Sequence, residues 1–256
     1  MLIHLDQLQI VLGLVLGALI GAAGGLFGIG GGLLAIPVLG LFFGLDQQHA
    51  QGTAMVMVAP NVLVGLVNYA RRVKLDARIA LALAASAVPL TYLGAHIATH
   101  VASAPLRRSF AIFLLAIGCV FVWRALRGKP VPAADAKRAP WPAAIPIGFA
   151  GGLLSGVFSV GGAVFAVPVL SIVFGISQAA AQGLGLALVA PGTLVGLYAY
   201  VSAGDVDWML AIPLAVAGML SVSYGVSLAL KLPEKALRLL FAALIFVSAA
   251  GLWVKA

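Results

Sequence analysis

Charged residues are scarce in this chain. They make up 9% of its 256 residues, and hydrophobic residues make up 63%, whereas an average soluble domain is about a quarter charged. This composition excludes a soluble globular protein and predicts an integral membrane protein. Apolar runs of about 20 residues, the length that crosses a bilayer, fill nearly the whole sequence. We therefore expect one multi-pass transmembrane domain over residues 1–256, without a separate soluble domain.

Cysteine and acidic residues are also few. The single cysteine, Cys119, excludes a disulfide framework and a cysteine-rich metal site. None of the seven acidic residues lies inside a confident apolar span, and a cation site or a carboxylate proton relay in a membrane needs such groups. We therefore expect no metal and no other cofactor. The net charge of +8 lies in loops between the apolar runs, where basic residues set topology, so nucleic acid is not an expected partner.

Ten apolar segments form two sets of five. The first set covers residues 7–125 and the second covers residues 143–254, and a linker rich in proline and charge, residues 126–142, separates them. The segments run roughly over residues 7–27, 33–44, 48–70, 79–101 and 106–125, then 143–158, 163–175, 179–203, 208–230 and 236–254.

The two sets align without a gap when 131 is added to the residue number. The matched pairs include Phe27 with Phe158, Pro37 with Pro168, Gln51 with Gln182, Tyr69 with Tyr200, and Asp76 with Asp207. Chance matches of Gly, Ala and Leu are expected in so biased a composition, but not a gap-free series that includes Gln, Tyr, Asp and Pro. The chain is therefore predicted to be an internal duplication.

The basic residues predict that the two halves have inverted topology. The loop 71–78 contains four basic residues, whereas its counterpart 202–207 contains none. Inverted halves place 12 of the 15 basic residues on the cytoplasmic side, and parallel halves place only 9 there. The positive-inside rule therefore favours inversion, with a cytoplasmic linker and both termini on the extracytoplasmic side of the membrane.

A glycine-rich break recurs in both halves. Gly28-Ile29-Gly30-Gly31-Gly32 is followed by Pro37, and its copy Ser159-Val160-Gly161-Gly162-Ala163 is followed by Pro168. The apolar segments after the breaks, 33–44 and 163–175, are too short to cross a hydrocarbon core of about 30 Å. The fold class expected is all-α: a polytopic transmembrane helical bundle of two inverted-topology repeats with glycine-broken or re-entrant helices.

These breaks are the best candidates for a binding site. Breaks at matching places in inverted halves point to a transporter's substrate site, because a half-helix leaves unpaired N–H groups and a positive dipole end that stabilise an anion. The alternative is that the glycines only allow close helix packing. The backbone of the site would come from Gly28, Gly30, Gly31, Gly32, Ser159, Gly161 and Gly162.

Polar side chains inside the spans complete the candidate site. Gln51 and Gln182 occupy matching positions and could donate amide hydrogens to an oxyanion, or could instead bond helix to helix. Weaker candidates of the same kind are Thr53, Asn61 and Thr193. Two tyrosines at span ends, Tyr69 and Tyr200, are expected to be anchors at the membrane interface. No catalytic residue is expected, because no nucleophile and base pair is evident within the spans.

Three stretches resemble the TauE/SafE family of sulfite and organosulfonate exporters. They are Gly28-Ile29-Gly30-Gly31-Gly32 with Pro37, His49-Ala50-Gln51-Gly52-Thr53, and Tyr200-Val201-Ser202-Ala203-Gly204-Asp205-Val206-Asp207-Trp208. The resemblance extends over almost the whole chain, from about residue 8 to 254. It implies an inner-membrane carrier for small sulfur oxyanions, with the glycine breaks of both halves facing the substrate.

The hypothesis from the sequence is a secondary transporter that moves sulfite or an organosulfonate such as sulfoacetate by alternating access. Its expected partners are the small anion, the lipid bilayer, and a coupling ion such as a proton or sodium; a homo-oligomer is compatible with the sequence. One alternative is a transporter for a neutral solute or a metal ion. The other is a membrane-embedded enzyme or assembly factor.

Overall fold

The computed structural model describes residues 2–127, 139–159 and 161–254, and these residues form helices joined by short loops. The first five helices are α1 (Leu2–Phe27), α2 (Gly32–Phe42), α3 (Gln47–Arg72), α4 (Ala77–His100) and α5 (Ser103–Arg127). A short 3₁₀ turn, η1 (Trp141–Ala143), precedes α6 (Ala144–Phe158), α7 (Gly161–Val173), α8 (Gln178–Ala203), α9 (Trp208–Ala229) and α10 (Glu234–Val254). Most of the linker, residues 128–138, lies outside the described residues.

The helix bounds confirm the segments expected from hydropathy. The fold is an all-helical bundle, and seven helices of the described residues are long and apolar enough to cross a bilayer. The helices α2 and α7 have 11 and 13 residues, so at 1.5 Å per residue they reach only about 17–20 Å. The bounds of α3 and α8 differ by 131 residues at both ends, which is the shift that aligns the two halves of the sequence.

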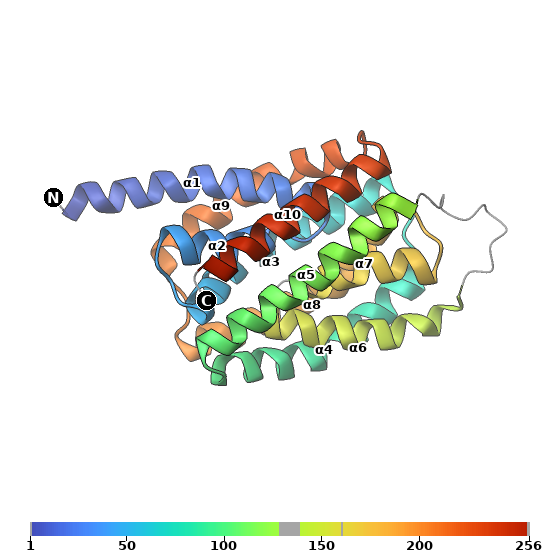
Figure 1. Cartoon of the computed structure of the whole chain (residues 1–256), viewed down its shortest axis with the longest axis horizontal. Coiled ribbons are helices and arrows are strands. Elements are labelled where there is room, and N and C mark those ends of the chain that lie inside the picture. The colour runs from blue at the N-terminus through green and yellow to red at the C-terminus, as the bar shows by residue number, and fades with distance from the viewer. Residues whose placement is uncertain (1, 128–138, 160, 255–256) are drawn as a thin grey trace.

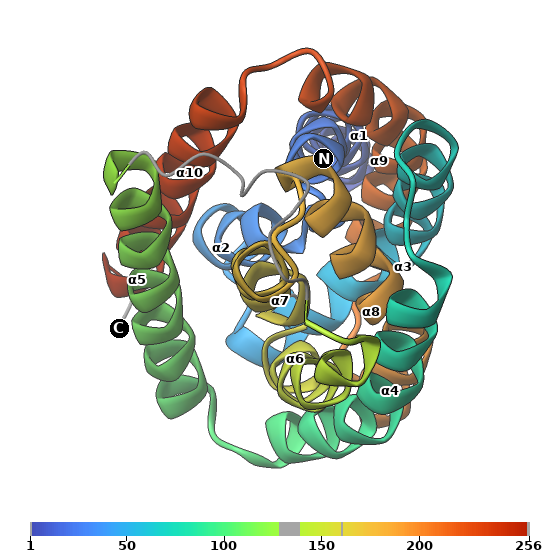
Figure 2. The same cartoon turned by 90° about the vertical axis from the view of Figure 1, so that its right-hand side faces the viewer.

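Both short helices begin at a reversal of the chain. Figure 1 shows that α2 turns back toward the end of the bundle where α1 begins, whereas α7 turns back toward the opposite end, where α6 begins. In the view along the bundle, α2 and α7 lie near the centre, between the α5 and α10 pair on one side and α3 and α8 on the other (Figure 2). Two helix hairpins therefore enter the core from opposite ends.

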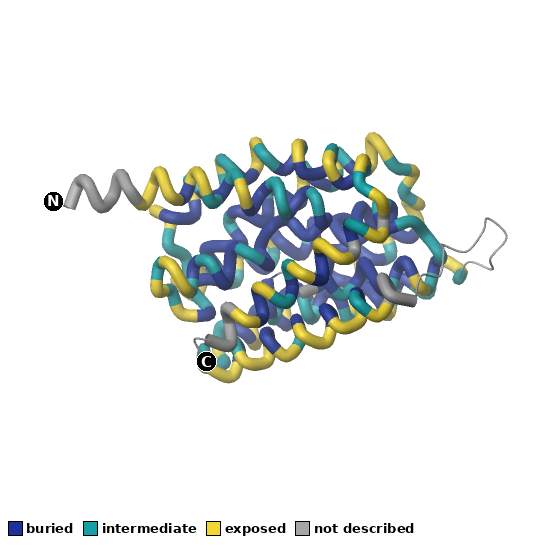
Figure 3. The backbone as a smooth tube through the Cα atoms, turned by 45° about the horizontal axis from the view of Figure 1, so that its top comes forward, coloured by how far each residue is buried: buried dark blue, intermediate teal, exposed yellow. Residues whose placement is uncertain are grey.

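Burial identifies α3 and α8 as the core of the bundle. Within their most apolar windows, 67% of α3 and 61% of α8 is buried, against 33–44% for the other five candidate spans. Large apolar side chains point outward on the peripheral helices, such as Leu81 at 70% and Leu220 at 74% exposure. Figure 3 shows the same pattern, with buried residues inside and exposed ones around the outside. Lipid would cover these outer apolar faces.

Each hairpin packs on a helix of the other half. The helix α1 lies along α9, and α6 lies along α4. The contacts are close because small residues face the partner backbone: a Cβ added to Gly17 would lie 2.6 Å from the Leu214 carbonyl oxygen, and one added to Gly148 would lie 2.8 Å from the Leu83 oxygen. Gly148 and Leu83 stand 131 residues from Gly17 and Leu214, so the same packing occurs twice with the halves exchanged.

Candidate substrate site

The break between α1 and α2 requires glycine. Gly28, Gly30 and Gly31 have φ angles of 65°, 73° and 98°, in the region that glycine adopts without strain. The Ile29 N–H donates to the Gly24 carbonyl at 3.0 Å and so closes the loop. The break also has no room for a side chain at position 30, because a Cβ on Gly30 would lie 2.6 Å from Val62 Cγ2. The break is therefore fixed by backbone conformation and by packing together.

The break between α6 and α7 has a serine in the same conformation. Ser159, which corresponds to Gly28, has a φ of 61° and is the one non-glycine residue with positive φ among the described residues. Left-handed backbone costs about 1–2 kcal/mol for a residue with a Cβ, and strain of this size is often kept at functional sites. Gly161 begins α7 and Gly162 follows it, whereas Val160 lies outside the described residues.

Gln182 is bonded at both ends of its amide. Its Oε1 lies 2.9 Å from the hydroxyl of Tyr69, and that hydroxyl also lies 3.0 Å from the carbonyl oxygen of Gly25. Its Nε2 donates to the carbonyl of Leu26 at 3.3 Å. The side chain packs directly on the break, because a Cβ on Gly28 would lie 2.6 Å from Gln182 Cβ. Gln182 therefore holds the tip of the α1–α2 hairpin.

Gln51 makes the corresponding contact at the other tip, but it is bonded at one end only. The Tyr200 hydroxyl donates to Gln51 Oε1 at 2.7 Å and lies 3.5 Å from the Gly156 carbonyl oxygen. Gln51 is 0% exposed, yet its Nε2 has no hydrogen-bond partner in the protein. A buried donor without a partner costs about 1–3 kcal/mol.

The two clusters also show how α3 and α8 are oriented. Tyr69, near the end of α3, meets Gln182, near the start of α8, and Tyr200, near the end of α8, meets Gln51, near the start of α3. The two core helices therefore run antiparallel. Each cluster joins a tyrosine of one half to a glutamine of the other, so neither cluster is complete within a single half.

Comparisons with known proteins agree with these features. The sequence model of the family described as sulfite exporter TauE/SafE matches residues 13–252. The chain belongs to this family. It is 26% identical over 235 residues to a probable membrane transporter protein of Methanocaldococcus jannaschii, covering 87% of this chain and 85% of that protein. It is 29% identical over 220 residues to a probable membrane transporter protein of Xylella fastidiosa, with coverage of 83% and 82%. The probable membrane transporter protein YunE of Bacillus subtilis is 23% identical over 250 residues, with coverage of 89% and 91%.

Most residues expected from the sequence lie at the two breaks of this TauE/SafE family member. Those at the first break are Gly28, Gly30, Gly31, Gly32, Asn61 and Gln182, and those at the second are Gln51, Ser159, Gly161 and Gly162. Asn61 Nδ2 donates to the Gly30 carbonyl at 3.2 Å, while its Oδ1 is buried without a partner. Two residues have other contacts. Thr53 Oγ1 accepts from the Asp207 N–H at 2.9 Å, and Thr193 bonds the carbonyl of Ala190 in its own helix at 2.8 Å.

The expectation that Tyr69 and Tyr200 anchor the protein at the membrane interface is wrong. Both side chains are 0% exposed, because each hydroxyl reaches the tip of a hairpin deep in the bundle. Ser155 was not expected in the site either. Its hydroxyl is buried without a partner, and a Cβ added to Gly162 in the first turn of α7 would lie 2.8 Å from Ser155 Cβ. The tyrosines recur at the same shift as the glutamines they contact, and that joint recurrence is the signal that could have identified them.

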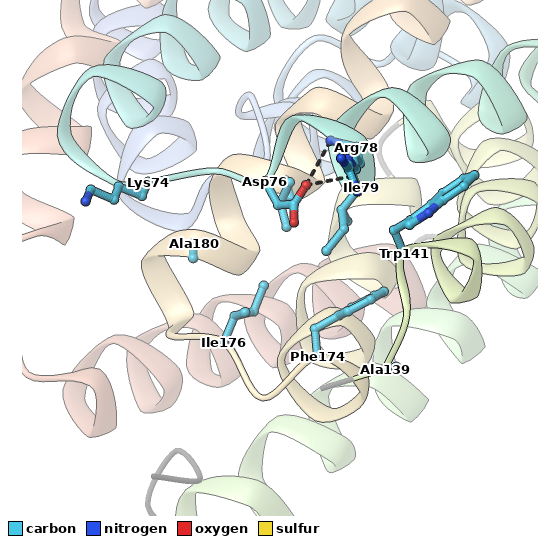
Figure 4. Close-up of a pocket in the computed structure, with 10 residues that line it drawn as sticks. Lys74, Asp76, Arg78, Ile79, Ala139, Trp141, Phe174, Ile176 and Ala180 are labelled. Carbon is cyan, nitrogen blue, oxygen red and sulfur yellow. Dashed lines mark hydrogen bonds between the residues drawn. The ribbon is translucent and has the colours of Figure 1, made fainter. Parts of the chain in front are cut away.

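One end of this family member carries a cavity of about 240 Å³. Its lining residues come from the α3–α4 loop, the region before α6, and the chain around the start of α8: Lys74, Asp76, Arg78, Ile79, Ala139, Trp141, Phe174, Ile176, Ala180 and Leu184. In Figure 4 the Asp76 carboxylate accepts from the N–H groups of Arg78 at 2.9 Å and Ile79 at 3.4 Å, capping α4, while Lys74 points away from this group.

The opposite end carries a cluster of charge. His49 Nδ1 lies 3.1 Å from Asp46 Oδ1 and 3.8 Å from Asp205 Oδ1. Burial raises the pKa of the Asp205 carboxyl above its ordinary value, the neighbouring His49 opposes this rise, and Asp46 adds to it. Within the described part of the chain, no three His, Cys, Asp or Glu side chains are grouped as metal ligands would be.

Proposed function

We propose that this protein is a secondary transporter that carries a small sulfur-containing anion, sulfite or an organosulfonate such as sulfoacetate, across the cytoplasmic membrane. Membership of the sulfite exporter family and the transporter names of its relatives support transport. The observation that supports an anionic substrate is the pair of helix breaks in the core, each with a buried glutamine beside it. The N–H groups at the start of α2 and α7 have no acceptor within their helices and favour negative charge.

We propose further that the two halves, residues 7–125 and 143–254, form an inverted repeat and move by alternating access. The antiparallel contact of α3 with α8 supports inversion, because corresponding helices of parallel repeats would run the same way. The exchanged pairs Tyr69 with Gln182 and Tyr200 with Gln51 support a motion in which the halves rock about a shared site. In this arrangement both termini are extracytoplasmic, the linker is cytoplasmic, and a proton or sodium ion drives transport.

The alternatives have less support. A metal transporter needs a group of carboxylate or imidazole ligands, and the described residues contain no group of three or more that could hold an ion. A membrane-embedded hydrolase needs a nucleophile beside a base. Ser159, the buried serine at the second break, lies next to Tyr200, and no hydrogen bond joins its hydroxyl to a histidine or carboxylate.

The test is uptake of radiolabelled sulfite and of sulfoacetate into proteoliposomes that contain the purified protein. We expect flux above that of empty liposomes, and we expect the double variant Gln51→Ala with Gln182→Ala to lower it by about tenfold or more, since it removes the glutamine hydrogen bonds beside both helix breaks. Ser86→Ala is the matched control, because this buried hydroxyl bonds the Ala82 carbonyl of its own helix. Flux in the double variant equal to that of the wild type would remove the glutamines from the site.

A further inference from the structure

The two helix tips differ in which polar groups remain unbonded. At the first tip, Gln182 uses both polar atoms of its amide, on Tyr69 and on Leu26, and the neighbouring positions are Gly24 and Gly28. At the second tip, serines replace both glycines at the 131-residue shift, as Ser155 and Ser159. Each serine is 1% exposed; the Ser155 hydroxyl has no hydrogen-bond partner in the protein, and the Ser159 hydroxyl lies beside the Tyr200 hydroxyl without meeting the usual distance and angle of a hydrogen bond.

Gln51 adds a third buried donor at the second tip. Tyr200 holds Oε1 of this amide and thereby fixes the orientation of the side chain, which leaves Nε2 without an acceptor at 0% exposure. These three groups come from two places in the fold: Ser155 lies in the last turn of α6 and Ser159 caps that helix, whereas Gln51 lies near the start of α3. Ser155 also lies against Gly162 in the first turn of α7, where free N–H groups favour an anion.

We infer that the anion binds at the second tip alone, with the Ser155 and Ser159 hydroxyls and Gln51 Nε2 donating to the oxygens of its sulfonate or sulfite group. Tyr200 is a positioning residue that orients the amide of Gln51. The first tip, where Gln182 is fully bonded, is a structural clasp that holds α1 against α8. This inference rests on the proposed function and narrows it, because it assigns unequal roles to two copies of one sequence pattern.

The strained backbone of Ser159 fits this assignment. Its φ of 61° would suit glycine, which occupies the corresponding position 28 with a φ of 65°. Glycine at 159 would relieve the strain, so stability alone does not favour a serine there. A hydroxyl that donates to the substrate gives the serine a reason to be present.

The test measures the dissociation constant of radiolabelled sulfite for the full-length protein in lipid nanodiscs, together with its thermal midpoint. We expect Ser159→Gly to raise Kd by about tenfold or more, as expected for loss of a hydrogen bond to a charged ligand, while the midpoint rises or stays the same. Ser155→Ala should raise Kd in the same direction. Ser86→Ala, which removes a hydroxyl bonded within its own helix, should leave Kd unchanged.

The mirror pair of glutamine variants separates this inference from the function itself. We expect the Kd of Gln51→Leu to exceed that of Gln182→Leu by about tenfold. Equal Kd values for these two variants, or a wild-type Kd in Ser159→Gly, would overturn the assignment to the second tip and leave the transporter proposal standing. If the wild-type protein bound neither sulfite nor sulfoacetate, the proposed function would fail as well.

Discussion

The two ends of the α3 and α8 pair differ more than the two helix tips do. At the start of α3, His49 contacts Asp46 of its own half and Asp205 of the other half, and Thr53 accepts from the Asp207 N–H. The corresponding positions at the start of α8 are Ser177, Ala180, Lys74 and Leu184. Ala180 and Leu184 lack a polar side chain, Ser177 is uncharged, and Lys74 has the opposite charge to Asp205.

The cavities at the two ends differ as well. The end without these polar contacts carries the cavity of about 240 Å³, lined in part by Lys74, Ala180 and Leu184, and the opposite end carries one of about 500 Å³ beside the ends of α4 and α8. Hydrogen bonds join the halves at both ends, because Arg72 Nη1 donates to Ser227 Oγ at 2.7 Å near the end of α3, but the residues that make these bonds differ between the two ends. A repeat protein with identical halves would bond both ends alike. Divergence of a few side chains is therefore enough to give the two ends different contacts between the halves.

The largest effect is expected when cysteines placed at the two ends are labelled, because each should react from only one side of the membrane. Arg71 and Ser202 are exposed residues at corresponding places in the last turns of α3 and α8. In a Cys119→Ser background, Arg71→Cys should react with an impermeant thiol reagent only from the cytoplasmic side, and Ser202→Cys only from the extracytoplasmic side. Labelling of intact spheroplasts against inverted vesicles measures this. Reaction of both cysteines from the same side would exclude inverted halves.

A smaller effect is expected from the paired glycines Gly52 and Gly183. A Cβ on Gly52 would overlap the backbone carbonyl of Asp205, whereas one on Gly183 would lie 2.8 Å from Leu75 Cδ2, the end of a flexible side chain. Gly52→Ala should therefore destabilise the protein by about 1–3 kcal/mol, as overpacking against rigid atoms does. Gly183→Ala should cost less than about 1 kcal/mol because Leu75 can move. Thermal melts of the two variants measure the difference, and equal losses would show that both ends are equally rigid.

The smallest effect concerns pH. Because burial raises the pKa of Asp205 above its ordinary value of 3.8, the folded state favours the protonated carboxyl. The free energy of unfolding contributed by this group is then greatest at acidic pH and falls as the pH rises through the raised pKa. The charges that face Asp205 are His49 and Asp46 on α3 and Asp207 in its own loop.

Melting the protein at a series of pH values from about 4 to about 7 tests this. Asp205→Asn should reduce the change in the free energy of unfolding across this pH range by less than about 1 kcal/mol, because partly exposed charges interact weakly. His49→Ala should extend this fall in stability to higher pH, since it removes the side chain that opposes the rise in the Asp205 pKa. An unchanged pH profile in Asp205→Asn would show that the carboxyl is not destabilised by the fold.

Much of the fold follows from the sequence, because hydrophobic runs and a gap-free repeat determine the helix positions independently of packing. The breaks before Gly32 and Gly161 were predictable for the same reason, since glycine and chain length leave little choice there. The burial of Tyr69 and Tyr200 was not, because a tyrosine near a span end has the same sequence context at a lipid interface as beneath a hairpin tip. Ser155 was not predicted as a site residue because its counterpart is Gly24, and a serine in that sequence context is indistinguishable from a small residue that only allows close helix packing.

The exchanged tyrosine contacts have a consequence for synthesis. Tyr69 and Gln182 are separated by 113 positions in the chain, so the α1–α2 hairpin is inserted long before its clasp is translated. Until then the Tyr69 hydroxyl has the Gly25 carbonyl but no glutamine, and the first half leaves the ribosome with an incomplete core. Late contacts of this kind delay final packing until the second half arrives. The core is therefore complete only after the second half has been synthesised, although the sequence divides into two similar halves.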